Sequence, residues 1–186
     1  YGRDAQAEEI LLDALKTVID PNTGKDLVSG KQLKNLQIEG GDVSFDVELG
    51  YPAKSQMPLL RKALVAAARS VPGVDNVSAN MSWKIVSHAV QRGVALIANV
   101  KNIVAVASAK GGVGKSTTAA NLALALAAEG ASVGILDADI YGPSQPMMMG
   151  ITARPESSDG KTMESLENYG VQVMSIGFLI DADNPM

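Results

Sequence analysis

The sequence predicts two successive domains of different fold class: a small α+β domain, then the first part of an α/β domain with a mainly parallel sheet. Two patterns predict the first domain, namely an apolar stripe with helical spacing and a run that alternates between apolar and polar residues. The second domain is predicted by a continuous apolar run that leads into a glycine-rich loop and an Ala/Leu-rich stretch. That order is typical of a buried strand, a tight turn and a helix.

The first segment is predicted to be a helix. Apolar residues recur at i, i+4 and i+8 spacing over residues 10–19 and form one stripe. The stretch 20–24, Asp-Pro-Asn-Thr-Gly, ends the helix because proline cannot continue it and Asn and Gly favour turns. Two strands follow, at 36–38 and 43–49. The second alternates strictly, which indicates one buried face and one solvated face.

A second helix and a third strand complete this domain. We expect Ser55 to cap the helix and Pro58 to lie in its first turn. Pro72 and Gly73 end the helix, and residues 74–81 form the strand. The predicted order is therefore α-β-β-α-β. It assigns residues 1–84 to the α+β domain and residues 85–101 to a linker.

The second domain is expected to cover residues 102–186. Its first strand is the apolar run 103–107, which is predicted to be buried on both faces. A helix over 117–128 follows the glycine-rich loop, and Gly130 can cap it in left-handed geometry. Residues 133–136 give another buried strand, and the apolar run 171–180 reads as a core strand. This β-α-β unit opens an α/β domain.

The loop Lys-Gly-Gly-Val-Gly-Lys-Ser at 110–116 has the pattern of a phosphate-binding P-loop. The strict pattern, Gly-x4-Gly-Lys-Ser/Thr, fails only at Ala109, and the rest fits the deviant form with two lysines. Glycines let successive N–H groups turn inward, and with the positive end of the following helix these groups form an anion site. We expect Lys115 to contact the β- and γ-phosphates and Ser116 to offer its hydroxyl to Mg²⁺. The predicted ATP-binding residues are Ala109, Lys110, Gly111, Gly112, Val113, Gly114, Lys115, Ser116 and Thr117.

Lys110 is the extra lysine of the loop. A lysine at this place can reach phosphates on a facing subunit, or it can be a solvated loop lysine, and the local pattern leaves both open. We count Lys110 and Lys115 as candidate catalytic residues.

An acidic turn, Asp137-Ala138-Asp139, follows the predicted strand 133–136 directly. Ligands bind at the carboxyl ends of strands in such sheets. Two carboxylates beside a magnesium nucleotide can orient water or hold the hydration shell of the metal. Asp139 is therefore the candidate for positioning the attacking water, and Asp137, with Ser116, is a candidate metal residue. A purely structural capping turn is the alternative, because Asp, Gly142 and Pro143 all favour turns.

Composition excludes several classes of protein. The net charge of −4 and the pI near 5.0 argue against a nucleic-acid binder. There is no cysteine, so neither a disulfide scaffold nor a thiolate metal site belongs to this chain. We find no signal peptide and no apolar run long enough to span a membrane, which makes the cytoplasm the expected location. The chain begins at Tyr1 rather than Met and stops just after an apolar run, so we expect a fragment.

The loop and the acidic stretch together carry a family resemblance. The two-lysine loop, followed by Asp-Ala-Asp-Ile-Tyr-Gly-Pro-Ser-Gln-Pro at 137–146, resembles the Mrp/ApbC family of iron–sulfur cluster carrier ATPases, relatives of MinD, ParA and the nitrogenase iron protein. The stretches 20–28 and 43–47 resemble the small iron–sulfur assembly domain fused ahead of the ATPase in bacterial members. The Gly-Pro-Ser continuation is the more specific signal, since MinD- and ParA-type proteins generally lack it.

This resemblance implies a cytoplasmic ATP-hydrolysing homodimer in which Lys110 crosses to the partner's ATP. It also implies a [4Fe–4S] cluster bound between subunits and passed to apo-proteins, with cluster assembly factors as further partners. The family's Cys-x-x-Cys ligands and its second acidic switch are missing here. We therefore expect ATP and Mg²⁺ as ligands of this chain, the cluster only in the full-length protein, and weak hydrolysis by the fragment.

Two other functions remain open at this level. One is a partitioning or cell-division ATPase of the MinD/ParA class, and the other is a non-enzymatic interaction module built on the small domain. The lone histidine, His88, reads as a surface residue of the linker. Met147, Met148 and Met149 form either an adaptable contact surface or a short buried turn.

Overall fold

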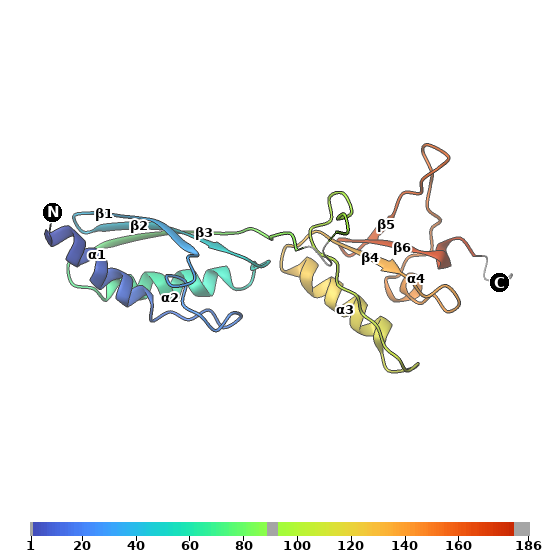
Figure 1. Ribbon diagram of the computed structural model, residues 1–186, viewed down its shortest axis with the longest axis horizontal. Helices are drawn as coiled ribbons and strands as arrows, with labels where there is room; N and C mark the ends of the chain where they lie inside the picture. Colours follow the sequence, from blue (N-terminus) through green and yellow to red (C-terminus); the bar gives the residue numbers. More distant parts are fainter. Residues whose placement is uncertain (1, 89–92, 181–186) are drawn as a thin grey trace. The chain divides into compact units, whose positions relative to one another are not determined.

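The computed structural model describes residues 2–88 and 93–180, which divide into two compact units at Asn102 and Ile103 (Figure 1). Each unit contains a three-stranded sheet, and both sheets are mixed. The chain is thus a small α/β structure in both halves. Each unit is described by itself below.

The first unit has the predicted order α-β-β-α-β. Its elements are α1 (Gly2–Leu15), β1 (Leu33–Glu39), β2 (Asp42–Leu49), α2 (Met57–Arg69) and β3 (Asn76–Trp83). The strand order is β1-β2-β3, with β2 antiparallel to β1 and parallel to β3. Both helices lie on the same face of this sheet (Figure 1).

The core of the first unit follows from the alternation in β2. Val43, Phe45, Val47 and Leu49 are all buried, and they pack against the apolar sides of α1 and α2. Successive side chains of a strand point to opposite faces, so the intervening polar residues lie on the solvated face. The turn after α1 adds a buried carboxylate, because Asp20 accepts hydrogen bonds from the Tyr51 hydroxyl (2.8 Å) and the Asn22 N–H (2.9 Å).

Three local expectations for the first unit were wrong in detail. The first helix ends at Leu15 rather than reaching Ile19, because the turn at 20–25 draws Ile19 into a β-bridge with Asp26. Ser55 is not the N-cap of α2. Residues 53–56 already form a turn that continues into the helix, so that Gln56 takes this position without a side-chain capping bond. The third strand covers Asn76–Trp83 rather than 74–81, because Val74 still closes a turn onto Val71.

The second unit contains α3 (Lys115–Ala128), β4 (Val133–Asp137), α4 (Gln145–Met148), β5 (Leu166–Asn168), β6 (Val171–Ser175) and the short 3₁₀ turn η1 (Ile176–Phe178). The strand order is β4-β6-β5, with β4 parallel and β5 antiparallel to β6. Gly130, at φ +98°, ends α3 in the left-handed geometry expected for it. The predicted core strand at 171–180 is five residues of strand followed by η1.

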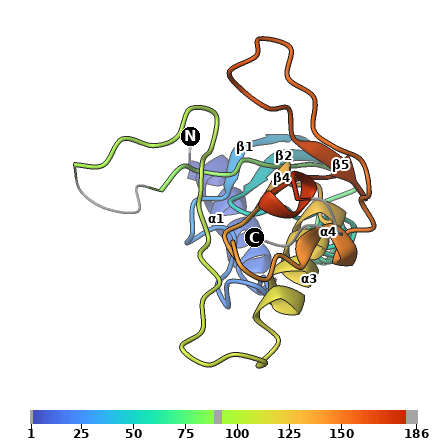
Figure 2. The ribbon, with the colours of Figure 1, turned by 90° about the vertical axis from the view of Figure 1, so that its right-hand side faces the viewer.

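Two expectations about this sheet are not met. Residues 103–107 form no strand and lie mostly exposed, as an unpaired coil that leads to the glycine-rich loop (Figures 1 and 2). The strand β4 is not buried on both faces, since Leu136 is 76% exposed. An apolar run becomes a buried strand only where neighbours distant in sequence pair with it and cover it. In the described part of the chain β4 pairs with β6 alone, and a mainly parallel sheet is not confirmed.

Candidate nucleotide-binding site

The glycine-rich loop enters α3 directly. Its conformation begins with a small turn in which the Ser108 hydroxyl accepts the Lys110 N–H (3.1 Å) and donates to the Lys110 carbonyl (2.7 Å). Gly112 and Gly114 have φ values of +72° and +86°, which side chains with a Cβ rarely adopt. Gly114 is the N-cap of α3, and its carbonyl accepts the first helical hydrogen bond from the Thr118 N–H at 2.9 Å.

Backbone donors are concentrated in this loop. In the described ranges, the N–H groups of residues 111–117 donate to no protein acceptor. A Cβ added at Gly111, Gly112 or Gly114 would meet no atom within 4 Å, so the space in front of the loop is open. Free N–H groups beside the positive end of a 14-residue helix form an anion-binding arrangement. A phosphate group is one anion that such an arrangement suits.

The two lysines supply mobile positive charge to the loop. Lys110 is exposed, and Lys115 and Ser116, in the first turn of α3, are half-buried. Within the described residues neither ammonium group is in an ion pair, which leaves both cations available to an anionic ligand. Among the same residues, no hydrogen bond or ion pair joins either lysine to Asp137 or Asp139.

Asp137 organises the acidic turn. It is the last residue of β4, and its Oδ2 accepts hydrogen bonds from the N–H groups of Ser144 and Gln145 (both 3.1 Å) and from the Ser175 hydroxyl (3.2 Å). Within the described parts of the chain, its Oδ1 accepts only the Asp139 N–H, at 3.1 Å. A carboxylate oxygen has two lone pairs, so Oδ1 retains one for a further donor such as metal-bound water. The carboxylate therefore holds the turn together and still offers an acceptor.

Asp139 belongs to the same turn, two residues after Asp137. It is half-buried, and its Oδ1 accepts the Gly142 N–H at 2.9 Å. The capping bonds expected from a purely structural turn are thus present at both aspartates. They leave acceptor capacity on each carboxylate, so they do not exclude a role toward a ligand.

One residue of this region was not singled out from the sequence. Gln145 is only 3% exposed, and its Nε2 donates to the Ser116 carbonyl at 3.0 Å. It thereby connects the acidic turn to the first turn of α3, bringing the neighbourhoods of Ser116 and Asp137 together. A glutamine next to Ser144 and Pro146 carries no pattern that marks it as buried, because its contact is with a segment 29 residues away.

His88 and the methionine run were also singled out from the sequence. His88 is exposed, and its Nδ1 lies 2.9 Å from the Asn102 Oδ1. Met149 is fully buried, whereas Met147 is 82% exposed, so the methionine run divides between a buried turn and a surface. No group of three or more His, Cys, Asp or Glu residues with metal-binding geometry occurs in the described residues. No helix among them has the length and apolarity needed to cross a membrane.

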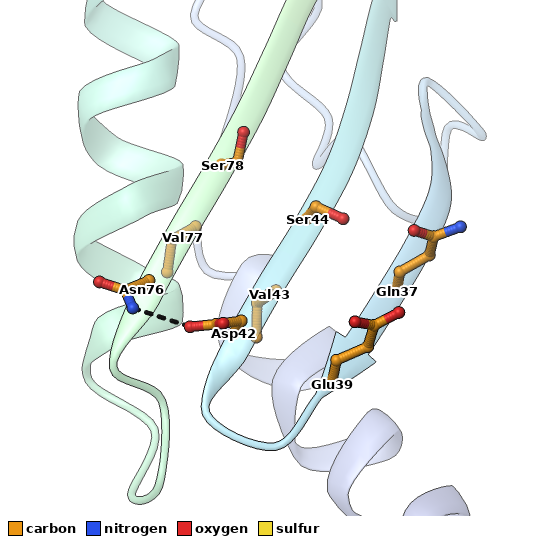
Figure 3. Close-up of a pocket in the computed structure, with 8 residues that line it drawn as sticks. All are labelled: Gln37, Glu39, Asp42, Val43, Ser44, Asn76, Val77 and Ser78. Atoms are coloured by element: carbon orange, nitrogen blue, oxygen red, sulfur yellow. Dashed lines mark hydrogen bonds between the residues drawn. The ribbon is translucent and has the colours of Figure 1, made fainter.

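A hollow of about 330 Å³ lies on the solvated face of the first unit's sheet (Figure 3). Its lining is polar and includes the carboxylates of Glu39 and Asp42, and the Asn76 Nδ2 donates to the Asp42 Oδ1 at 2.7 Å. Acidic side chains disfavour an anionic ligand here. This hollow therefore lacks the features of a phosphate site.

A glycine-rich loop that enters a helix, next to an acidic turn at the end of a strand, defines the class of P-loop nucleotide-binding proteins. The comparisons agree with this class. Residues 99–186 match the family described as NUBPL iron-transfer P-loop NTPase, and residues 8–80 match the family described as iron–sulfur cluster assembly protein.

Several similar proteins are named as iron–sulfur cluster proteins. An "Iron-sulfur cluster carrier protein" of Synechocystis sp. is 38% identical over 96% of this chain and 52% of its own length. One of Pseudomonas fragi is 56% identical over 66% of this chain and 44% of its own. The chloroplastic "Fe-S cluster assembly factor HCF101" of Arabidopsis thaliana is 39% identical over 92% of this chain and 33% of its own. The chain belongs to the Mrp/ApbC family of iron–sulfur cluster carrier proteins.

The chain spans about half or less of the length of these relatives. Among solved structures, a domain of unknown function, DUF59, from Bacillus anthracis is 19% identical, covering 41% of this chain and 74% of its own. The TM-score is 0.38, which is too low to establish a common fold.

Proposed function

We propose that this chain is the nucleotide-binding part of an ATP-dependent carrier that delivers [4Fe–4S] clusters to apo-proteins. The observation that carries the proposal is the row of N–H groups at residues 111–117 that have no acceptor among the described residues. They lie at the start of α3, in a chain whose relatives are named as cluster carriers. In this proposal, residues 1–84 form the assembly domain, residues 85–101 form the linker and residues 102–186 belong to the NTPase domain. The sheet of the NTPase domain is mainly parallel in the full-length protein.

In this proposal, the residues of the loop and of the acidic turn have different roles in nucleotide binding and hydrolysis. Residues 109–117 hold the phosphates of ATP through N–H groups and the Lys115 ammonium. Ser116 and Asp137 would hold Mg²⁺, which supplies charge neutralisation on the phosphates. The Asp139 carboxylate accepts a hydrogen bond from a water molecule and orients this water toward the terminal phosphate. Lys110 is exposed and forms no ion pair with any described residue, as required of a lysine that reaches ATP on a second copy of the chain.

The cluster is cargo in this proposal, and its ligands lie outside the present sequence. Iron–sulfur clusters are held by cysteine thiolates, and this chain contains no cysteine. The role left to this chain is to bind nucleotide and, through its first unit, to contact assembly factors or apo-proteins. A partitioning function is disfavoured because the named relatives are cluster carriers and assembly factors.

Nucleotide binding is the direct test. Titration calorimetry of the chain with ATP and Mg²⁺ should give a measurable Kd, and Lys115→Ala should abolish binding. Lys161→Ala is the matched control, since it removes one exposed lysine from the same unit away from the loop. Equal binding by the Lys115→Ala variant would exclude the assignment of the loop.

A further inference from the structure

The buried amide of Gln145 joins the two halves of the candidate nucleotide site. Its backbone N–H donates to the Asp137 Oδ2 at 3.1 Å, and its side-chain Nε2 donates to the Ser116 carbonyl at 3.0 Å. Through Asp137 the connection continues to the Ser175 hydroxyl at the end of β6. One residue, through its backbone N–H and its side chain, therefore ties the end of the sheet to the first turn of α3.

Two acceptors at this junction have no donor. The Gln145 Oε1 and the Ser144 Oγ are both buried, and neither has a hydrogen-bond partner among the residues that the structure describes. A buried polar atom without a partner destabilises the folded state, whereas an apolar side chain of similar size would carry no such cost. The amide oxygen thus carries a cost in this state, and that cost is removed when a donor reaches it.

The position of these atoms identifies the kind of donor. Both atoms belong to residues whose backbone N–H groups donate to Asp137, and the Asp137 Oδ1 has a lone pair for a further donor. The Gln145 side chain is bonded to the carbonyl of Ser116, the residue that we expect to offer its hydroxyl to the metal. Mg²⁺ keeps several of its waters when bound to protein, and those waters are strong donors. A carboxylate oxygen, an amide oxygen and a hydroxyl oxygen together form a set of acceptors suited to a hydrated magnesium ion.

We propose that Gln145 is a positioning residue that couples Mg²⁺-nucleotide in the loop to the acidic turn. Its Nε2 fixes α3 against the turn, while its Oε1 and the Ser144 Oγ accept hydrogen bonds from the metal's hydration shell. Binding of the metal complex then removes the cost of the two unpaired acceptors. The inference rests on the proposed nucleotide binding and adds the residue that links the phosphate loop to the acidic turn.

Gln145→Leu separates this role from a structural one. The leucine removes the unpaired oxygen and also the Nε2 donor to the Ser116 carbonyl, so the two effects on stability oppose each other and the melting temperature by circular dichroism should change little. The readout is the ratio of the ATP Kd measured without Mg²⁺ to the Kd measured with it. The variant should lower this ratio about threefold to tenfold, which corresponds to the loss of one to two hydrogen bonds.

A second variant covers the case in which Gln145→Leu does not fold. Gln145→Asn keeps the amide but is one methylene shorter than the span to Ser116, and it should lower the same ratio. A ratio equal to that of the unaltered chain, in whichever variant folds, would overturn the coupling. Failure of the unaltered chain to bind ATP at all would instead refute the proposed function, so the two failures are distinguishable.

Discussion

The two units of this chain use their apolar residues differently. In the first, Phe45 and Leu49 are each 1% exposed, and every apolar residue of β2 lies beneath a helix. In the second, Val104 is 65% and Leu136 is 76% exposed, although both lie in runs that are typical of buried strands. The difference shows that apolarity alone does not bury a strand. Burial requires elements that pair with the strand and cover it, and the described part of the second unit supplies few of them.

The largest effect expected from this difference concerns the units in isolation. A fragment of residues 1–102 should unfold in a single cooperative thermal transition, because its core is continuous from α1 to β3. A fragment of residues 103–186 should show no such transition. Circular dichroism with calorimetry on both fragments measures this, and a cooperative transition of the second fragment would contradict the comparison.

Single truncations should show the same difference on a smaller scale. Phe45→Ala should reduce the free energy of unfolding by about 3–5 kcal/mol, through lost burial and the cavity it leaves. The matched change Leu136→Ala, at a side chain mostly in water, should stay within about 0.5 kcal/mol of the unaltered chain. Urea unfolding measures both. A cost at Leu136 as large as that at Phe45 would mean that the second unit buries this face in solution.

A smaller effect is expected at the buried carboxylate of the first unit. Tyr51→Phe removes the hydroxyl that donates to the Asp20 Oδ2 and keeps the aromatic ring in place. Because Asp20 is fully buried, the lost donor should reduce stability by about 1–3 kcal/mol. Tyr169→Phe, at a ring 66% exposed in the second unit, is the control and should change urea unfolding little. A neutral Tyr51→Phe would show that water replaces the hydroxyl.

Much of the first unit could be predicted from the sequence because its signals are local. The alternation Val43–Leu49 and the stop at Pro72-Gly73 are read within a few residues, and the structure confirms the elements they predict. The errors lie at boundaries such as Ile19 and Ser55, where a turn competes with the helix. In the second unit the run 103–107 gave a wrong prediction, because a central parallel strand is specified by partners far away in sequence.

The candidate site divides in the same way. The loop at 110–116 was predictable because glycine, lysine and serine at fixed spacing are themselves the chemistry of phosphate binding. The hydrogen bonds of Asp137 were predictable in kind, as capping of a turn, but not in extent, since one comes from Ser175 on another strand. Gln145 was not predictable. Its role depends on a side chain reaching Ser116 across 29 residues, and no local pattern encodes such a contact.

The smallest expected effects are two carboxylate titrations, one in each unit. In the second unit, the pKa of Asp159 is lowered from 3.8 to about 2 by hydrogen bonds from the Thr162 N–H, the Thr162 hydroxyl and the Lys161 N–H. A lowered folded pKa stabilises above the unfolded value, so this contribution is present above pH 3.8 and is lost as pH falls toward 2. Carbon-13 NMR of the side-chain carboxyl measures it, and Thr162→Val should raise the pKa.

Asp46 of the first unit has a lowered pKa for a different structural reason. The side-chain amides of Asn35, in β1, and Asn80, in β3, donate to its two oxygens, so the shift requires the assembled sheet. The donors to Asp159 all lie within three residues of it, so its shift requires only a local turn. In the fragment 103–186 the pKa of Asp159 should therefore remain low even though this fragment is not expected to fold cooperatively. In the fragment 1–102, the pKa of Asp46 should return to its ordinary value when Phe45→Ala and urea unfold the sheet. An Asp46 pKa that stayed low after the sheet had unfolded would mean that the first unit is also held by local turns rather than by its core.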